Sequence, residues 1–204
     1  MTLVTINSDA DIDKQIKHIQ SDLYDYLLSV GWTDYDSYPK AYKNQTPQGV
    51  IPEIYTDKGE YSEIFLNDRV NATSFFIVDD SRQISDRMFQ ANIKLIFQVD
   101  ISALYPRVTH RADEEVHEDV YYALQNNPFI VNISNLNTSL TDIYSGLRVD
   151  LSIYDDMQPY HIFSYDIEIR YSNICRKRNE TNFLLLENNS FLLQENGSRI
   201  KLEV

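Results

Sequence analysis

The residues best suited to metal or acid–base chemistry lie between positions 112 and 126, where His117 stands between Glu115 and Glu118. A metal site on one helix needs ligands three or four residues apart, because only then do the side chains share a face. Asp113 has that spacing from His117, but the segment contains no second histidine. We therefore expect His117 to lie on a solvated helix face, and we predict no metal ion and no cofactor.

A second polar group consists of Asp155, Asp156 and His161, on either side of Pro159. Such residues can form an acid–base pair or bind calcium, but the alternating acids and central glycine of a calcium loop are missing. Asp and Pro are common turn residues, so we interpret this group as turn-forming.

The single cysteine, Cys175, excludes an intrachain disulfide and a thiolate metal cluster. Arg176, Lys177 and Arg178 follow it directly and favour the reactive thiolate form. No motif supplies a partner histidine, and five scattered glycines are too few for a phosphate-binding loop. The sequence therefore predicts that the protein is not an enzyme.

The composition is that of a folded, acidic protein. Hydrophobic residues make up 43% of the 204 positions, and 31 acids against 18 bases give a net charge of −13. Such a charge repels nucleic-acid phosphates at long range. The N-terminus lacks the features of a secretory signal, and no apolar run approaches the roughly 20 residues that span a bilayer. We expect an intracellular protein without a membrane partner.

The regular elements begin with a helix over residues 11–30, capped by Ser8 or Asp9 and ended by Gly31, with Trp32 packed beneath its end. Its apolar residues recur at steps of three and four: Ile12, Ile16, Ile19, Leu23, Leu27 and Val30. A second helix over residues 112–126 begins with acids, which the helix dipole favours, and ends at Asn127 and Pro128.

The clearest strand covers residues 90–101, where Phe97 and four other apolar residues alternate with polar ones. We expect one face of this strand to pack on the core and the other to be mostly in water. Shorter strands are predicted around Pro52 and over residues 63–66, 74–78 and 129–133, and an antiparallel hairpin is predicted from residues 147–153 and 165–171. We interpret the remainder of residues 33–61 as irregular, residues 79–86 as a polar turn and residues 132–139 as a loop.

The C-terminal residues contain an eight-residue repeat, FLLLENNS over 183–190 and FLLQENGS over 191–198, followed by a final strand over 199–204. Short strands of this kind have no core of their own. We therefore predict a partner-docking arm, which binds the parent sheet or a neighbouring subunit by strand addition through Phe183, Leu185, Phe191, Leu193, Ile200 and Leu202.

Together these patterns predict an α+β fold, in which two main helices pack on one face of an antiparallel β-sheet and a C-terminal β-hairpin forms an extension. Residues 1–172 are predicted to be the core domain, and residues 173–204 the arm.

The order of elements resembles the tail-terminator and neck-protein family of tailed bacteriophages. The residues that carry the resemblance are 12–30, 91–101, 113–126 with the exit Asn127-Pro128-Phe129, and 165–171. The composition and the arm also look like those of the neck ring proteins of crAss-like phages. The resemblance implies a virion protein that forms a ring of six or twelve copies, joins the portal to an adjacent ring or to tail proteins, and lets DNA pass through its lumen.

If the resemblance holds, the acids of the second helix line either the lumen or a subunit contact; they are Asp113, Glu114, Glu115, Glu118 and Asp119. Two alternatives remain open. One is a soluble module that binds another protein through the arm. The other is a small hydrolase that uses Cys175 or the acids near His161.

Overall fold

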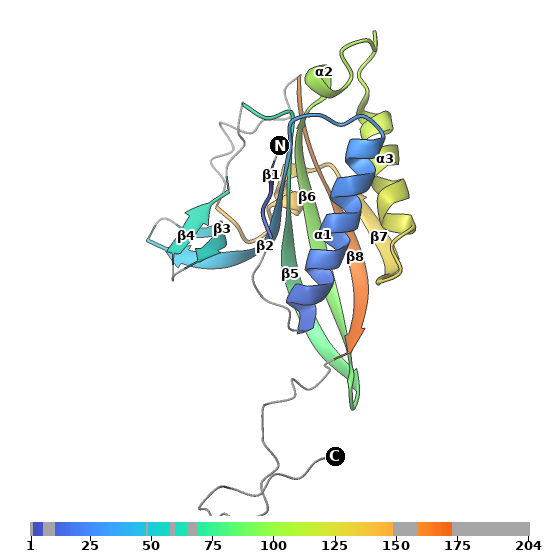
Figure 1. The fold of residues 1–204 in the computed structure, drawn as a ribbon. Helices are drawn as coiled ribbons and strands as arrows, with labels where there is room; N and C mark the ends of the chain where they lie inside the picture. Colours follow the sequence, from blue (N-terminus) through green and yellow to red (C-terminus); the bar gives the residue numbers. More distant parts are fainter. Residues whose placement is uncertain are drawn as a thin grey trace, which may run out of the picture. The chain divides into compact units, whose positions relative to one another are not determined.

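An eight-stranded, mostly antiparallel sheet forms the centre of the unit Met1–Ser172 (Figure 1). The computed structural model describes residues 2–5, 11–47, 49–57, 60–64, 69–148 and 159–172. The strand order is β4-β3-β2-β5-β6-β8-β7, with β1 parallel to the start of β2 and β2 parallel to β5. The strands are β1 Thr2–Leu3, β2 Tyr35–Thr46, β3 Gly49–Asp57, β4 Glu60–Glu63, β5 Ala72–Ser85, β6 Met88–Asp100, β7 Ile130–Asn137 and β8 Tyr160–Ser172.

Two long helices, α1 (Asp11–Ser29) and α3 (Asp113–Gln125), pack on one face of this sheet, and α2 (Ile101–Leu104) and α4 (Leu140–Ile143) are single turns. The predicted fold class and both predicted helices are confirmed. No helix in the described part of the chain is long and apolar enough to cross a membrane.

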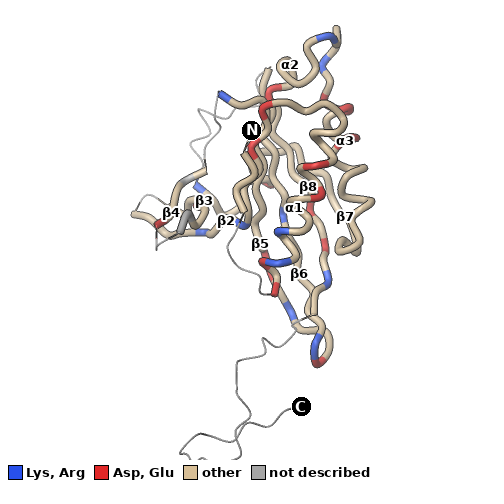
Figure 2. The backbone as a smooth tube through the Cα atoms, viewed as in Figure 1, with Lys and Arg blue, Asp and Glu red and all other residues tan. Residues whose placement is uncertain are grey.

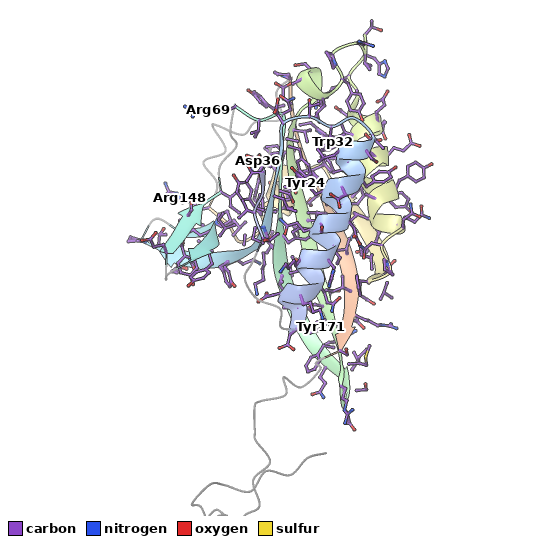
Figure 3. The ribbon with its side chains drawn as sticks, viewed as in Figure 1. Tyr24, Trp32, Asp36, Arg69, Arg148 and Tyr171 are labelled. Carbon is purple, nitrogen blue, oxygen red and sulfur yellow. The ribbon has the colours of Figure 1, made fainter. Side chains whose placement is uncertain are left out.

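The end of α1 is determined by Gly31, as predicted. Gly31 has a φ of 104°, which favours glycine, and its N–H donates to the carbonyl of Leu28 at 3.2 Å. The next N–H, that of Trp32, donates to Leu27 at 3.0 Å, which completes a Schellman motif. Trp32, labelled in Figure 3, is buried at the end of α1 in the same core cluster as Leu27.

The main core lies between the two helices and the sheet. The apolar face of β6, with Leu95 and Phe97, contacts the inner stripes of α1 and α3, and Phe97 stacks on Phe163 of β8 with 5.1 Å between ring centroids. Burial of one such large side chain contributes about 2–3 kcal/mol, so this face supplies much of the stability.

The opposite face of β6 is not mostly in water, and that prediction is wrong. Ile96 and Gln98 are buried there, in and beside a second apolar cluster that includes Ile143 and Tyr144. The Nε2 of Gln98 donates to the hydroxyl of Tyr144 at 2.7 Å. Beyond Tyr144, the segment up to Arg148 runs alongside β3, and the N–H of Arg148 donates to the carbonyl of Val50 in β3 at 2.5 Å. A segment far away in the sequence therefore covers this face, which the local alternation did not indicate.

Three predicted irregular regions are also strands. The region 33–49 contains β2, with Pro39 inside it. The strand predicted around Pro52 is present as β3, although it lies between β2 and β4 and not at the edge of the sheet. The predicted turn over 79–86 continues β5 to Ser85, and the predicted loop over 132–139 continues β7 to Asn137. Backbone pairing with β6 and β8 extends these strands through polar sequence. Residues 149–158, with most of the predicted strand 147–153, and the arm 173–204 lie outside the described residues.

Candidate functional site

Figure 2 marks acidic positions along the backbone of α3, and the carboxylates of its five acids have different surroundings. The carboxylate of Asp113 accepts hydrogen bonds from Arg111 Nε at 2.8 and 2.7 Å, and that of Glu115 contacts His110 Nε2 at 2.6 Å. This hydrogen bond from His110 lowers the pKa of Glu115. The side chain of Glu114 is 94% exposed, and Glu118 is exposed as well. Glu114 and Glu118 therefore contribute the acidic surface of α3.

Asp119 belongs to the packing of the fold. Its carboxylate accepts a hydrogen bond from the indole Nε1 of Trp32 at 2.9 Å and another from the hydroxyl of Tyr105. Burial, followed by the interaction with Asp119, raises the pKa of Tyr105 and keeps its hydroxyl protonated. Asp119 thereby joins the end of α1, the segment after α2 and the centre of α3.

His117 does not lie on a solvated face, and this prediction is wrong as well. It is 7% exposed, and its Nε2 lies 2.8 Å from the Nε2 of His161, which is 3% exposed and lies in β8. Both rings contact Phe163, with centroid distances of 4.8 and 5.4 Å. His161 is thus part of a strand and not of a turn, while Asp155 and Asp156 lie outside the described residues.

The two histidines share one proton along their contact, because one ring must donate and the other accept. Burial lowers the pKa of His117, and so does His161, while Glu114 and Asp113 act in the opposite direction. A guanidinium nitrogen of Arg111 lies 3.5 Å from the Nδ1 of His161. The hydroxyl of Tyr165 donates a hydrogen bond to the backbone carbonyl of His117 at 2.9 Å. These contacts hold α3 against β8, and the arrangement suits a structural polar pair.

The sequence contained a signal for this pair. His161, Phe163 and Tyr165 alternate, and extension of the predicted strand by four residues would have placed His161 on the helix-covered face. Among the described residues, no group of three or more His, Cys, Asp or Glu side chains could hold a metal ion.

An open depression lies on one face of the sheet, over strands β5 to β8. Carboxylates of β5 and β8 contribute to its lining. Asp166 accepts hydrogen bonds there from Asn135 at 3.3 Å and Asn137 at 3.1 Å. These amides satisfy the Oδ2 of Asp166, whereas its Oδ1 is buried and has no hydrogen-bond partner among the described residues. The depression is lined by Asp79, Asp80, Asn92, Ile93, Ser134, Asp166 and Ile167.

A wing is formed by the end of β2 with β3 and β4, on the side of the sheet away from β7 (Figure 1). It has three tyrosines in contact: Tyr61 lies 5.9 Å from Tyr42 and 5.4 Å from Tyr55 between ring centroids. Tyr55 is 39% exposed and Tyr61 is 49% exposed. Exposed, rigid aromatic rings at a strand edge are typical of protein contacts.

The distal hairpin, residues 79–92, is the second projecting feature. Every residue from 79 to 87 is exposed, although β5 and β6 remain paired to Ser85 and Met88. The hydroxyls of Ser81 and Tyr171 are 2.7 Å apart, and Phe89 stacks on Tyr171 (Figure 3). The hairpin is therefore ordered but adds little to the core.

No protein-family model, curated protein or solved structure matches this chain.

Proposed function

We propose that this protein is a structural ring component of a tailed-bacteriophage neck or head–tail connector, where it joins the portal to the tail. The observation that carries the proposal is that the sheet extends beyond the helix-covered main core at two different places, the wing and the distal hairpin. Both consist of regular strands whose exposed side chains gain little from the fold itself.

A closed ring needs two different, complementary surfaces on every subunit, because each copy contacts one neighbour with one surface and the other neighbour with the second. The wing and the distal hairpin are two such surfaces, and they come from different strands of one rigid sheet. The order of elements, with two helices on one face of an antiparallel sheet, agrees with the resemblance to the tail-terminator family. We expect six or twelve copies.

The acidic surface of the protein supports the proposal that DNA passes through the lumen of the ring. The net charge is −13, and Glu114 and Glu118 extend into solvent from α3. A negative lumen repels phosphates, so DNA slides without binding. The double variant Glu114→Lys, Glu118→Lys separates the two possible places of these acids. If they line the lumen, the variant should still form a ring and should gain salt-dependent DNA binding. If they lie at a subunit contact, the variant should no longer form a ring.

Native mass spectrometry and electron microscopy of the full chain test the proposal. We expect a closed ring of defined copy number, and the same protein in purified phage particles. A protein that remains monomeric at high concentration and is absent from particles contradicts it.

The binding-module alternative predicts a different result for removal of residues 181–204. A ring protein keeps its core fold and loses the attachments to neighbouring subunits that the arm makes, whereas a binding module loses its sole partner and shows no ring to begin with. We do not propose the hydrolase, because His161 is buried against His117 and Phe163.

A further inference from the structure

The outer edge of β4 has the properties of an acceptor for another strand. Within the described residues, β4 pairs with β3 alone, with Tyr61 opposite Tyr55 and Ser62 opposite Ile54. β4 is thus the terminal strand at this end of the sheet, and an extended peptide can bind such an edge by main-chain hydrogen bonds. β7, at the other end of the sheet, is interrupted by two register shifts, which makes it a poorer template.

The two faces of the wing at this edge differ in chemistry. One face carries the tyrosine cluster, where the Nζ of Lys40 already lies 4.9 Å from the ring centroid of Tyr42. Glu53 of β3 lies on the same face, where its carboxylate accepts a hydrogen bond from Asn44 Nδ2, and in the strand register it is paired with position 63, also a glutamate. The other face carries Ile54 and Ile64, both buried in the second apolar cluster. An incoming strand should therefore be basic on one side and apolar on the other.

Residues 199–204 of this chain, RIKLEV, have that pattern. In an extended strand, Arg199, Lys201 and Glu203 would fall on one side, with a net charge of +1, and Ile200, Leu202 and Val204 on the other. Cations opposite Tyr61 and the acidic positions gain cation–π and ionic contacts. At the same time, the apolar side extends the cluster that contains Ile54 and Ile64.

We propose that the outer edge of β4 in each copy binds residues 199–204 of a neighbouring copy as an added strand. This inference rests on the proposed ring. The chain between Ser172 and Arg199 spans up to about 85 Å when extended, whereas β8 and β4 are five strand spacings apart, about 24 Å. The arm can thus extend well past the width of its own sheet, and in the proposed ring each copy gives one arm and receives one, as a heterologous ring requires.

Disulfide trapping between two differently labelled full-length chains tests the inference. Both chains carry Cys175→Ser; one also carries Ser62→Cys on β4, and the other Ile200→Cys or Leu202→Cys in the arm. After mixing, assembly and mild oxidation, denaturing gels report crosslinked pairs, and native mass spectrometry of unoxidised samples reports the ring. The matched control replaces Ser62→Cys by Val131→Cys, an exposed position on β7 at the opposite edge.

We expect crosslinked heterodimers with Ser62→Cys at least tenfold above those with Val131→Cys. A ring without heterodimers at position 62 overturns the inference and leaves the proposed function intact. A chain that carries both Ser62→Cys and Ile200→Cys and gives only monomeric crosslinks shows that the arm folds back on its own sheet, which also overturns it. A monomer without crosslinks contradicts the ring and the inference together.

Discussion

The two halves of the β5–β6 pair differ in the burial of their side chains, although the backbones of both halves are paired. Residues 72–77 of β5 are all buried under the helices or the second cluster, whereas residues 79–85 are all exposed. The register nevertheless continues from Ala72 opposite Val99 to Ser85 opposite Met88. An isolated strand pair is marginal in water, so the distal half depends on the proximal half for its order. Stability therefore comes from one half, and we infer that the other half serves contacts with other molecules.

The largest effect is expected in the proximal half. Phe97→Asp removes a fully buried ring that stacks on Phe163 and contacts Trp32, and it places a charge in the main core. The loss of packing and the unpaired charge together cost more than about 5 kcal/mol, which is comparable with the whole stability of a small domain. Circular dichroism should show an unfolded chain. Gln83→Asp, the control in the distal half, should remain folded; equal behaviour of both variants would refute the contrast.

A smaller loss is expected for Asp119→Ala, because Trp32 and Tyr105 lose a shared, half-buried acceptor. A buried donor without a partner costs about 1–3 kcal/mol, so urea denaturation should show a drop in the free energy of unfolding of about that size. Glu118→Ala, one position earlier on the exposed side of α3, should change it by less than about 0.5 kcal/mol. If Glu118→Ala is the more destabilising of the two, the assignment of Asp119 to the fold is wrong.

The buried histidine pair predicts a loss of stability in acid. The folded protein lowers the pKa of His117 below its ordinary value of 6.5, so folding favours the neutral ring. This contribution is fully present above pH 6.5 and is lost as the pH falls from there through the lowered folded-state pKa. Thermal denaturation between pH 7.5 and 5 should show a falling midpoint for the natural protein.

His117→Phe should flatten that pH dependence, whereas His110→Gln should leave it unchanged, because His110 is exposed. The exposed contact of His110 with Glu115 adds little to stability. An equally steep dependence in His117→Phe would mean that other groups cause the acid sensitivity.

The sequence predicted the parts of the fold that local patterns determine. The stripe of α1, its stop at Gly31 and the apolar face around Phe97 each depend on residues close together in the chain. It did not predict contacts between distant segments. His117 and His161 are 44 positions apart, and Gln98 is covered by Tyr144, 46 positions away. Pro39 also misled the prediction, since it is accommodated inside β2, whereas the strand predicted around Pro52 is present as β3.

The candidate surfaces were predictable only in part. The acids of α3 were visible in the sequence, but their division into bonded and exposed members depends on Trp32, Tyr105 and His110, which are supplied by the fold. The tyrosines of the wing come from β2, β3 and β4, and no sequence spacing indicates that their rings meet. The ring and the role of the arm remain proposals.

The smallest effect on stability is expected at the tip of the distal hairpin, and it separates the two halves most sharply. Ile84 is an exposed apolar residue at a register shift of β5, beyond every core cluster. Ile84→Ser should therefore change the free energy of unfolding by less than about 0.5 kcal/mol. If the hairpin is a subunit contact, the same variant should shift the native mass spectrum from ring towards monomer, because an apolar anchor at an interface centre commonly contributes more than 1 kcal/mol.

Ile96→Ser, two residues from Lys94 in the buried half of β6, should instead lower the stability of the monomer itself. A variant at Ile84 that leaves both stability and ring formation unchanged would remove the hairpin from the interface, and within the described residues the wing would then remain as the projecting surface that joins the copies.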